Sequence, residues 1–526
     1  MRILNQDITL KRGSVTSDYR LFLILIIYTF LGIFLFRYYQ YQINEDGISY
    51  ITISKLVISG NLYGSISDYW SPLISWLLIP FLFFAKTPLV ALKATKILSL
   101  IIGFFTIIGI RQLSYRFEMD EIIRTVVLFI MVPIVLYFAL TNIHPDLLTV
   151  CVLVYYLAII FNVDYPNKLS NGVLCGILGA LAYLTKSYGF TFFIASFFIL
   201  NLFQYFHDSD RFRRKKIIKN FVLGFAIFLM ISGIWISLIS NKDEKLTIGT
   251  AGEINYAKFG PQSHGSTIIQ GIYNPNKVNP NFIPKQWSPF SSWSNFKYQL
   301  HLIKNNTLKI GSILYNFSYL SLLIILAYII MCIQPPRKLI TKNEILYPLV
   351  TILIAAGGYV IVVVEARYIW IINILLILMG GYLINLLFKT DFFTKLKFRN
   401  IIKFGILLVF AFLFITMPVN YLVQNAHTGE GTYNLSNTLM NQYGVHGNVA
   451  TNGRSVEMNY LNYYMKNTFY GQSQNNISAL ELRSELENNG VNYYFVWDNS
   501  NQSSYMYGYN EITNNKIKNL KVYSLK

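Results

Sequence analysis

Two adjacent acids, Glu45 and Asp46, follow the first long apolar run of the chain and are its strongest candidates for chemistry. Tyr50 lies four residues after Asp46, and a third acid, Asp68, precedes an aromatic corner at 69–76. A carboxylate is able to remove a proton from an attacking hydroxyl. Because acids are costly near hydrocarbon, acids at a membrane surface usually mark a working site. We therefore expect a working site in this segment, with an ordinary solvated loop as the alternative.

Further polar residues stand at the ends of later apolar runs. Carboxylates and cations gathered on one face suit a reaction in which a base deprotonates a hydroxyl while Lys and Arg neutralise a phosphate leaving group. Each has a structural alternative, because Asp146 can cap a helix, Lys186 can snorkel to the interface and Glu365 can pair with Arg367. The residues of this group are His144, Asp146, Lys186, Glu365, Arg367 and Tyr368, with Lys93 as a further member. Lys86 and Lys96 are expected at the surface.

Other chemistries have little support in the sequence. The three cysteines, Cys151, Cys175 and Cys332, each fall inside an apolar run and form no metal-binding or disulfide pattern. The chain contains no Walker motif, GxGxxG, HExxH or G-x-S-x-G. ATP-driven coupling and zinc proteolysis are therefore not indicated. A divalent metal ion, if one is used, is expected to be bound by Asp46 and Asp146.

Composition places the chain among polytopic membrane proteins. Of its 526 residues, 54% are hydrophobic and 13% are charged, whereas soluble domains carry roughly 25% charged residues. The net charge of +19 is explained by Lys and Arg in cytoplasmic loops and does not indicate a nucleic-acid partner. The basic segment 1–20 predicts a cytoplasmic N-terminus followed by a retained signal-anchor, in a plasma or inner membrane.

The apolar runs predict about 11 transmembrane helices, with the C-terminus exoplasmic. The run at 73–84 is too short to span and is expected to lie at the outer surface. If it spanned, the basic run at 211–216 would lie outside, so the positive-inside rule favours the odd count; Arg337 and Lys338 then also lie inside. The expected crossings are 21–36, 90–110, 122–140, 147–161, 173–185, 190–206, 221–239, 310–333, 346–364, 369–388 and 401–417.

Two segments outside the crossings are expected to differ from the rest. The outer loop 240–309 is polar and rich in aromatics but has no long periodic run, and loops of that length are usually functional or disordered. After 421 no run is long enough to span. Ser478 and Glu481 form a capping box whose helix ends before Gly490, and strands are expected at 449–451 and 491–497.

The sequence therefore predicts an all-α polytopic membrane protein with a small C-terminal exoplasmic α/β domain. The membrane domain is expected at 1–420, with outer loops at 39–89 and 240–309, and the exoplasmic domain at 421–526.

Five short motifs, in order, resemble the polytopic glycosyltransferases of the GT-C fold, in the branch of the protein O-mannosyltransferases and the lipid A aminoarabinose transferase. Each motif is weak alone, and their order is what makes the resemblance specific. They are Asp46 with Tyr50 and the Ser59-Gly60-Asn61 break, the aromatic and proline corner Tyr69–Trp76, His144-Pro145-Asp146, the glycine-rich run 179–186 ending in Thr185-Lys186, and Glu365-Ala366-Arg367-Tyr368. The chain departs from the aminoarabinose branch at Trp70-Ser71, where that branch has Glu-Lys.

The resemblance implies that Asp46 is the catalytic carboxylate, with Glu45 as the second candidate, and that Lys186 and Arg367 lie near a donor phosphate. The remaining candidates would bind substrate. The implied reaction is transfer of a monosaccharide, with inversion, from a polyprenyl-phosphate sugar to an exoplasmic glycan, lipid or protein.

Two other functions remain open from the sequence. A polymerase or ligase of lipid-linked glycans usually has Arg and His in a large outer loop, and here 240–309 has His264 and His301 but no Arg. A transporter would predict inverted repeats, and no convincing internal symmetry is present.

Overall fold

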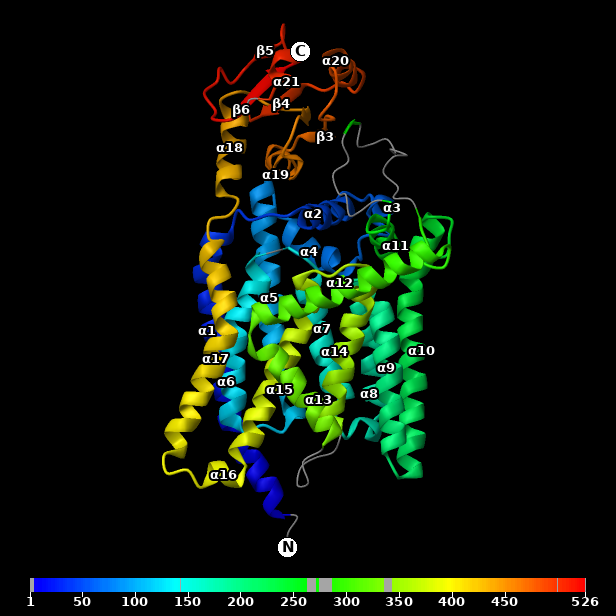
Figure 1. Ribbon diagram of the computed structural model, residues 1–526, viewed down its shortest axis with the longest axis vertical. Coiled ribbons are helices and arrows are strands. Elements are labelled where there is room, and N and C mark those ends of the chain that lie inside the picture. The colour runs from blue at the N-terminus through cyan, green and yellow to red at the C-terminus, as the bar shows by residue number, and fades with distance from the viewer. Residues whose placement is uncertain are drawn as a thin grey trace.

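The computed structural model describes residues 4–141, 143–262, 271–273, 286–334, 343–498 and 500–525, and for residues 4–18, 343 and 344 it describes the backbone alone. His264, Arg337 and Lys338 lie outside the described residues. The long axis of the molecule runs through a helical bundle, with the N-terminal end below it and the C-terminal domain above it (Figure 1).

Eight of the described helices are long and apolar enough to cross a bilayer. Two further helices, α7 and α8, have only 15 and 17 residues but pack within the same bundle. Together with a bent pair described below, these helices match the expected crossings in position. The bundle helices are α1 (Leu4–Tyr39), α5 (Pro88–Ser114), α6 (Glu121–Thr141), α7 (Asp146–Ile160), α8 (Leu169–Thr185), α9 (Tyr188–His207), α10 (Arg211–Lys242), α14 (Asn343–Val362), α15 (Trp370–Phe388) and α17 (Arg399–Gln424).

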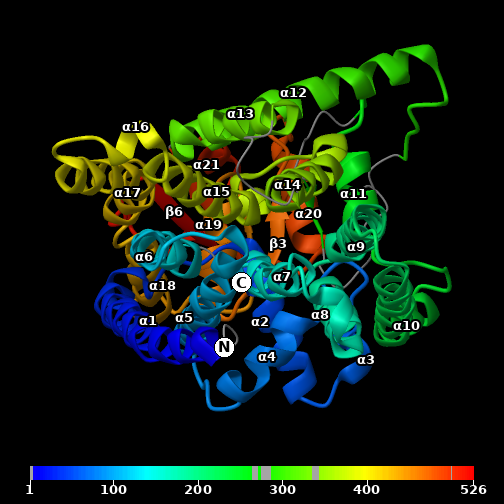
Figure 2. The same cartoon turned by 90° about the horizontal axis from the view of Figure 1, so that it is seen from below.

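Helices α6 and α15 form the core of the bundle. Both are apolar around their whole circumference, which is the pattern of a helix surrounded by other helices. Within their spanning windows 72% and 78% of the residues are buried, against 17% in α1 and α17. Phe138 and Trp370 stack face to face between α6 and α15, with ring centroids 3.9 Å apart. Seen from below, α1, α10 and α17 lie at the periphery and α7 lies near the middle (Figure 2).

The expected crossing at 310–333 is not a single continuous helix. Helix α12 (Trp293–Phe317) continues to Phe317, and the chain then turns by 113° into α13 (Leu320–Ile333). Helix α12 slopes along one side of the bundle near its upper end, and α13 then descends along the bundle (Figures 1 and 2). Polar residues along α12, such as Lys304, Asn305 and Lys309, would be costly in hydrocarbon and keep this helix at the surface. The outer loop 240–309 therefore contains the greater part of a long helix, which its sequence did not suggest.

The run at 73–84 forms α4 (Leu73–Leu82), a helix of only 10 residues, which confirms that it is too short to span. It lies at the upper end of the bundle beside α2 (Figure 1). The short elements are α2 (Glu45–Ile58), α3 (Leu62–Ser65), α11 (Ala251–Lys258), α16 (Asp391–Thr394) and the 3-10 turns η1 (Tyr115–Phe117), η2 (Tyr165–Asn167) and η4 (Ala366–Ile369).

The C-terminal domain is built on a sheet of six strands in the order β1-β3-β2-β4-β6-β5. Strand β2 pairs in parallel with β3 and with β4. The pairs β1–β3, β4–β6 and β6–β5 are antiparallel. The expected capping box at Ser478 and the left-handed turn at Gly490, with φ of +64°, are both confirmed. The elements are α18 (Glu430–Asn441), β2 (Asn448–Thr451), α19 (Ser455–Met465), β3 (Thr468–Gln472), α20 (Ala479–Asn488), β4 (Tyr493–Trp497), α21 (Gln502–Tyr505), β5 (Asn510–Glu511) and β6 (Leu520–Ser524).

The edge strand β1 (Gly271–Ile272) comes from the outer loop 240–309 rather than from the C-terminal segment. It pairs antiparallel with β3, and Tyr273 adds a backbone hydrogen bond to Tyr470 of 2.8 Å. The sheet is therefore shared between two segments that are far apart in the sequence.

Candidate active site

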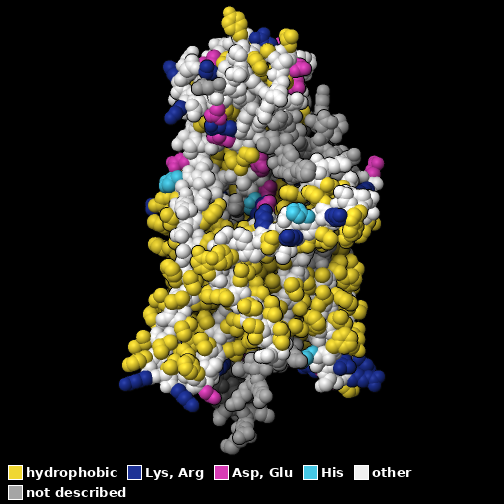
Figure 3. All heavy atoms as spheres, in the orientation of Figure 1, with side chains coloured by type: hydrophobic (Ala, Val, Ile, Leu, Met, Phe, Trp, Pro, Cys, Tyr) yellow, Lys and Arg dark blue, Asp and Glu magenta, His cyan; other side chains and the backbone are white. Residues whose placement is uncertain are grey.

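The first turn of α2 and three junctions between helices meet at the upper end of the bundle and carry the charged residues singled out in the sequence. The junctions are α6–α7, α8–α9 and α14–α15. Acidic, basic and histidine side chains gather there in a hollow between the C-terminal domain and the apolar belt (Figure 3). The topology thus places these residues together although their positions span more than half of the chain.

Arg367 is the centre of the charged group. Its Nη1 lies 2.6 Å from Oδ2 of Asp46, and its Nε lies 2.7 Å from Oε2 of Glu365 and 3.9 Å from Oδ2 of Asp146. The same Nη1 contacts the ring of His144, 2.7 Å from Nε2. The Arg367 side chain is 18% exposed, so it remains within reach of a ligand.

Asp46 is held by His144 as well as by Arg367. Its Oδ2 lies 3.0 Å from Nδ1 of His144. Burial alone would raise the pKa of Asp46, but the hydrogen bond from His144 and the charges of His144 and Arg367 hold that pKa well below its usual range. Asp46 is therefore a stable carboxylate, 28% exposed, at the N-terminus of α2, where a negative charge is favoured.

The first turn of α2 packs directly on the α6–α7 junction. A Cβ at Gly47 would lie 2.8 Å from Cβ of Ile143, so only glycine allows this approach. Asn44 precedes α2 and accepts a hydrogen bond of 3.0 Å from the backbone N–H of Ile143, while its amide lies 3.4 Å from His144. These contacts bring Asp46 to His144.

A second ion pair lies beside the first. Nζ of Lys186 lies 2.7 Å from Oδ1 of Asp146, at the start of α7, and both side chains are largely buried. Burial lowers the pKa of Lys186, and the charge of Asp146 opposes that shift. Asp146 thus pairs with a cation instead of capping its helix, and Lys186 points into the protein instead of snorkelling to the interface.

Two stacked tyrosines support the ammonium group of Lys186. Nζ lies 3.6 Å from the centroid of the Tyr368 ring and 5.3 Å from that of Tyr359. The two rings stack with centroids 4.7 Å apart. Such contacts stabilise a cation by about 1 to 2 kcal/mol when water is excluded. Tyr368 therefore lies against Lys186 in this group, and Tyr359 is an addition that no pattern in its apolar run indicated.

The remaining candidates lie at varying distances from this group. Glu45 points away from Arg367 and accepts a hydrogen bond of 2.9 Å from Asn459 of α19. Tyr50 is buried against Trp70, and burial followed by the charges of Asp46 and Asp146 raises its pKa. Tyr50 therefore lies near the site. The two adjacent acids face different partners, since Glu45 contacts Asn459 and Asp46 contacts Arg367 and His144.

Asp68 and Lys93 are not joined to the Arg367 group by any hydrogen bond or ion pair within the described part of the chain. Asp68 accepts a hydrogen bond of 2.6 Å from Thr250 and so ties the first outer loop to the second. Lys93 lies half-buried on α5, one turn above Lys96.

Lys96 contradicts the expectation of a surface residue. Its side chain is 0% exposed, and its amine donates a hydrogen bond to the carbonyl of Leu140 in the last turn of α6. The last carbonyls of a helix lack partners within it, and a cation there also complements the helix dipole. The position of Lys96 within an apolar run gave no signal of this contact, which secures the helix end that leads to His144.

The arrangement does not favour a metal ion at Asp46 and Asp146. Oδ2 of Asp46 and both oxygens of Asp146 already face Arg367 or Lys186. Among the residues that the structure describes, no three His, Cys, Asp or Glu side chains form a group suited to a metal. Metal dependence stays a prediction from the sequence.

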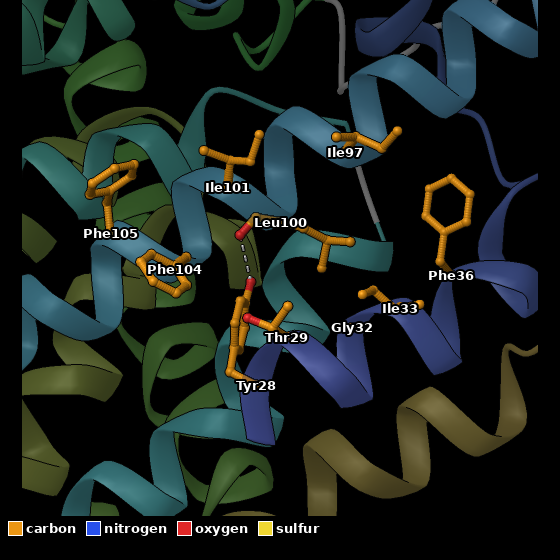
Figure 4. A pocket seen from close by; sticks show the side chains of 10 residues that line it. All are labelled: Tyr28, Thr29, Gly32, Ile33, Phe36, Ile97, Leu100, Ile101, Phe104 and Phe105. Carbon is orange, nitrogen blue, oxygen red and sulfur yellow. Dashed lines mark hydrogen bonds between the residues drawn. The ribbon is translucent and has the colours of Figure 1, made fainter. Parts of the chain in front are cut away.

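Two apolar hollows lie apart from the charged group. One, of about 590 Å³, lies between α1 and α5, and its lining side chains include Ile33, Phe36 and Ile101 (Figure 4). Figure 4 marks one hydrogen bond in this hollow, which the hydroxyl of Tyr28 donates to the carbonyl of Leu100 at 3.0 Å. None of its lining residues belongs to the ion pairs described above.

No protein-family model and no curated protein sequence matches the chain. Solved structures do match. ArnT from Cupriavidus metallidurans, in the apo state and bound to undecaprenyl phosphate, superposes with a TM-score of 0.56 at 12% identity, covering 95% of this chain and 97% of that chain. The oligosaccharyltransferase of Archaeoglobus fulgidus in the apo form gives a TM-score of 0.52 at 11% identity, covering 91% of this chain and 69% of that chain.

The Archaeoglobus protein AglB, in complex with an inhibitory peptide and a dolichol-phosphate, gives a similar TM-score of 0.53. ArnT and AglB both have the GT-C fold. The likeness over nearly the whole chain establishes the GT-C fold here and confirms the fold that the sequence motifs led us to expect.

Proposed function

We propose that the protein is a membrane glycosyltransferase that transfers a monosaccharide from a polyprenyl-phosphate sugar to an exoplasmic acceptor with inversion. The contact of Arg367 with Asp46 is the observation that carries this proposal, because it joins a cation able to grip phosphate to a carboxylate at one partly exposed point. The likeness to ArnT, solved with undecaprenyl phosphate, and to AglB, solved with a dolichol-phosphate, supports a lipid-linked donor.

In the proposed reaction the acceptor hydroxyl attacks the anomeric carbon from the side opposite the phosphate. The bond between that carbon and the phosphate oxygen breaks, and its electron pair remains on the polyprenyl phosphate. Asp46 takes the proton of the hydroxyl. Arg367 and Lys186 stabilise the negative charge that grows on the leaving group.

Donor binding would also change the state of Asp46. Three carboxylates, Asp46, Asp146 and Glu365, face two cations, Arg367 and Lys186. We infer that the donor phosphate takes over Nη1 of Arg367 from Asp46. The carboxylate then loses a neighbouring charge that lowers its pKa and becomes a stronger base once the donor is in place.

The test is sugar transfer by the protein in membranes supplied with a labelled polyprenyl-phosphate sugar and extracted surface glycan. We expect label to pass to the glycan with release of polyprenyl phosphate, and the anomeric configuration of the product, read by NMR, to be opposite to that of the donor. Label that stays on the lipid with every extract would contradict the proposal, and a retained configuration would contradict single displacement.

Transfer of a preassembled glycan is the second candidate. The likeness to an oligosaccharyltransferase favours it, although this chain covers only 69% of that protein. The same assay separates the two candidates, because a donor lipid carrying one sugar would then be a poor substrate compared with a lipid carrying an oligosaccharide.

A further inference from the structure

The C-terminal domain has the topology of a ligand-binding α/β sheet. From β2 the chain passes through α19 to β3 on one side, and from β3 it returns through α20 to β4 on the other side of β2. Helix α19 packs on one face of the sheet and α20 on the other. The strand order therefore reverses between β2 and β4, and in open α/β sheets ligands bind beyond the carboxyl ends of the strands at such a point.

The residues at this point are held in uncommon conformations. Arg454, just after β2, and Asp498, just after β4, both have left-handed backbones, with φ of 53° and 57°. Their side chains form a two-pronged ion pair, with Nη2 to Oδ1 at 2.6 Å and Nε to Oδ2 at 3.1 Å. Such conformations cost about 1 to 3 kcal/mol and concentrate at functional sites. Here they place the side chains of Arg454 and Asp498 for this ion pair.

The indole of Trp497 lies beneath the ion pair. The Arg454 guanidinium lies 4.7 Å from the ring centroid of Trp497, which is 4% exposed. Nε1 of Trp497 is buried without a hydrogen-bond partner among the described residues. A buried donor of this kind is costly unless a ligand or water satisfies it.

Arg454, but neither Asp498 nor Trp497, also lines a cavity of about 410 Å³ that reaches the first outer loop at Ile43. This volume is within the roughly 300–1,000 Å³ typical of small-ligand sites. Its polar lining comes from Arg454, Glu457, Tyr460, Thr428 and Thr432. Ile43, three residues before Asp46, is part of its apolar lining. Burial raises the pKa of Tyr460 to about 12, and the charges of Glu45 and Asp46 add to that shift. Glu45, the neighbour of Asp46, accepts a hydrogen bond of 2.9 Å from Asn459, which precedes Tyr460 on α19. The cavity thus lies beside the turn that carries Asp46.

The charges of the lining select against an anion. Arg454 is already balanced by Asp498 and by Glu457, whose Oε2 lies 3.5 Å from Nη1. The groups left to a ligand are the second carboxylate oxygen of Glu457, the phenol of Tyr460 and the hydroxyls of Thr428 and Thr432, around a mainly apolar surface. A sugar ring has the matching chemistry, because its hydroxyls bind carboxylates and hydroxyls while its C–H face packs on a tyrosine ring.

We propose that this cavity binds a neutral, hydroxyl-rich glycan and presents it to Asp46 as the acceptor. The proposal rests on the proposed function, since it names the class of molecule that receives the sugar. It also gives the C-terminal domain a specific role, which is to recognise the acceptor through Glu457 and Tyr460.

The test uses the full chain in lipid nanodiscs, free of sugar detergents, on a printed array of neutral, sialylated and phosphorylated oligosaccharides. The variant Glu457→Gln with Tyr460→Phe removes one charge and one hydroxyl from the cavity. The control Glu487→Gln with Tyr509→Phe makes the same changes at an exposed pair of the same domain, 3.1 Å apart and remote in sequence from the cavity lining. We expect the wild type and the control to retain neutral oligosaccharides, and the cavity variant to bind them at least about tenfold more weakly, the effect of losing one or two hydrogen bonds.

Three results would overturn the proposal: no oligosaccharide retained by the wild type, equal retention by the cavity variant, or a preference for the sialylated or phosphorylated probes. Thr432→Val, which only replaces a hydroxyl by a methyl, guards against misfolding of the double variant and should weaken binding in the same direction. Asp46→Asn should bind the array as the wild type does. Binding without sugar transfer would leave the cavity as a glycan site and contradict the proposed function alone.

Discussion

Replacing Asp46 by Asn tests the proposed base while leaving the shape of the side chain unchanged. The substitution removes the proton acceptor and the negative charge that faces Arg367 at 2.6 Å and His144 at 3.0 Å. Losing a positioned acid–base group typically lowers the rate by about 10² to 10⁴-fold. We expect a loss of kcat in this range.

The structure predicts that this loss is separable from unfolding. Arg367 keeps Glu365 at 2.7 Å and Asp146 at 3.9 Å, so its charge remains compensated without Asp46. A charge-assisted hydrogen bond contributes about 1.5 to 3 kcal/mol, and the 28% exposure of Asp46 favours the lower end of that range. The variant should therefore still insert and fold.

The assay is transfer from labelled donor lipid in membranes, with expression matched by blot and melting followed in nanodiscs. Glu45→Gln is the matched control, because Glu45 faces Asn459 instead of Arg367. Transfer by Asp46→Asn at the wild-type rate would refute the assignment of Asp46 as the base. If Glu45→Gln alone were inactive, the acid would be misassigned by one position.

Three further predictions follow from the charges and the topology. Arg367→Lys keeps the charge but loses the fork that grips phosphate, so we expect a raised KM for the donor lipid in steady-state assays, and an unchanged KM would reduce Arg367 to an ion-pair partner. A reporter fused after residue 526 should be active only in the exoplasmic compartment, and a cytoplasmic signal would overturn the odd number of crossings. Because the folded-state pKa of Asp46 is lowered, its contribution to stability should be complete above about pH 4 and be lost as the pH falls below that value. The difference in Tm between the wild type and Asp46→Asn should thus be constant from about pH 8 to pH 5, and a decline already at neutral pH would assign the effect to another group.

The sequence predicted the residues of the site better than their partners. Asp46, Lys186 and Arg367 stand out because charged residues at the ends of apolar runs break a local pattern. The contacts of Asn44 and Tyr359 depend on helices that are distant in the sequence, so no local pattern reports them. The same limit applies to strand β1, whose two residues become a strand only because β3 offers them an edge.

The helices show the same contrast between what a local sequence pattern reveals and what it misses. Hydropathy predicted the crossings and the short helix α4, since burial in a bilayer requires a long apolar run. It missed the bend between α12 and α13, because an apolar window from 310 onward does not register the polar residues that hold α12 at the surface. Lys96 was read as a surface residue since a lysine is rarely buried without a carboxylate, and here a helix end takes the place of the acid.

The buried Lys96 also bears on how the protein enters the membrane during its synthesis. It lies eight residues into α5, about 12 Å along the helix from Pro88. A lone lysine in hydrocarbon costs about 2.5 to 3.5 kcal/mol even by the mildest scale, and its partner carbonyl belongs to α6, the next helix to be made. A ribosome that has released only α5 leaves this amine unsatisfied, whereas release of α6 supplies the acceptor. Helices α5 and α6 are thus matched to leave the translocation channel as one hairpin.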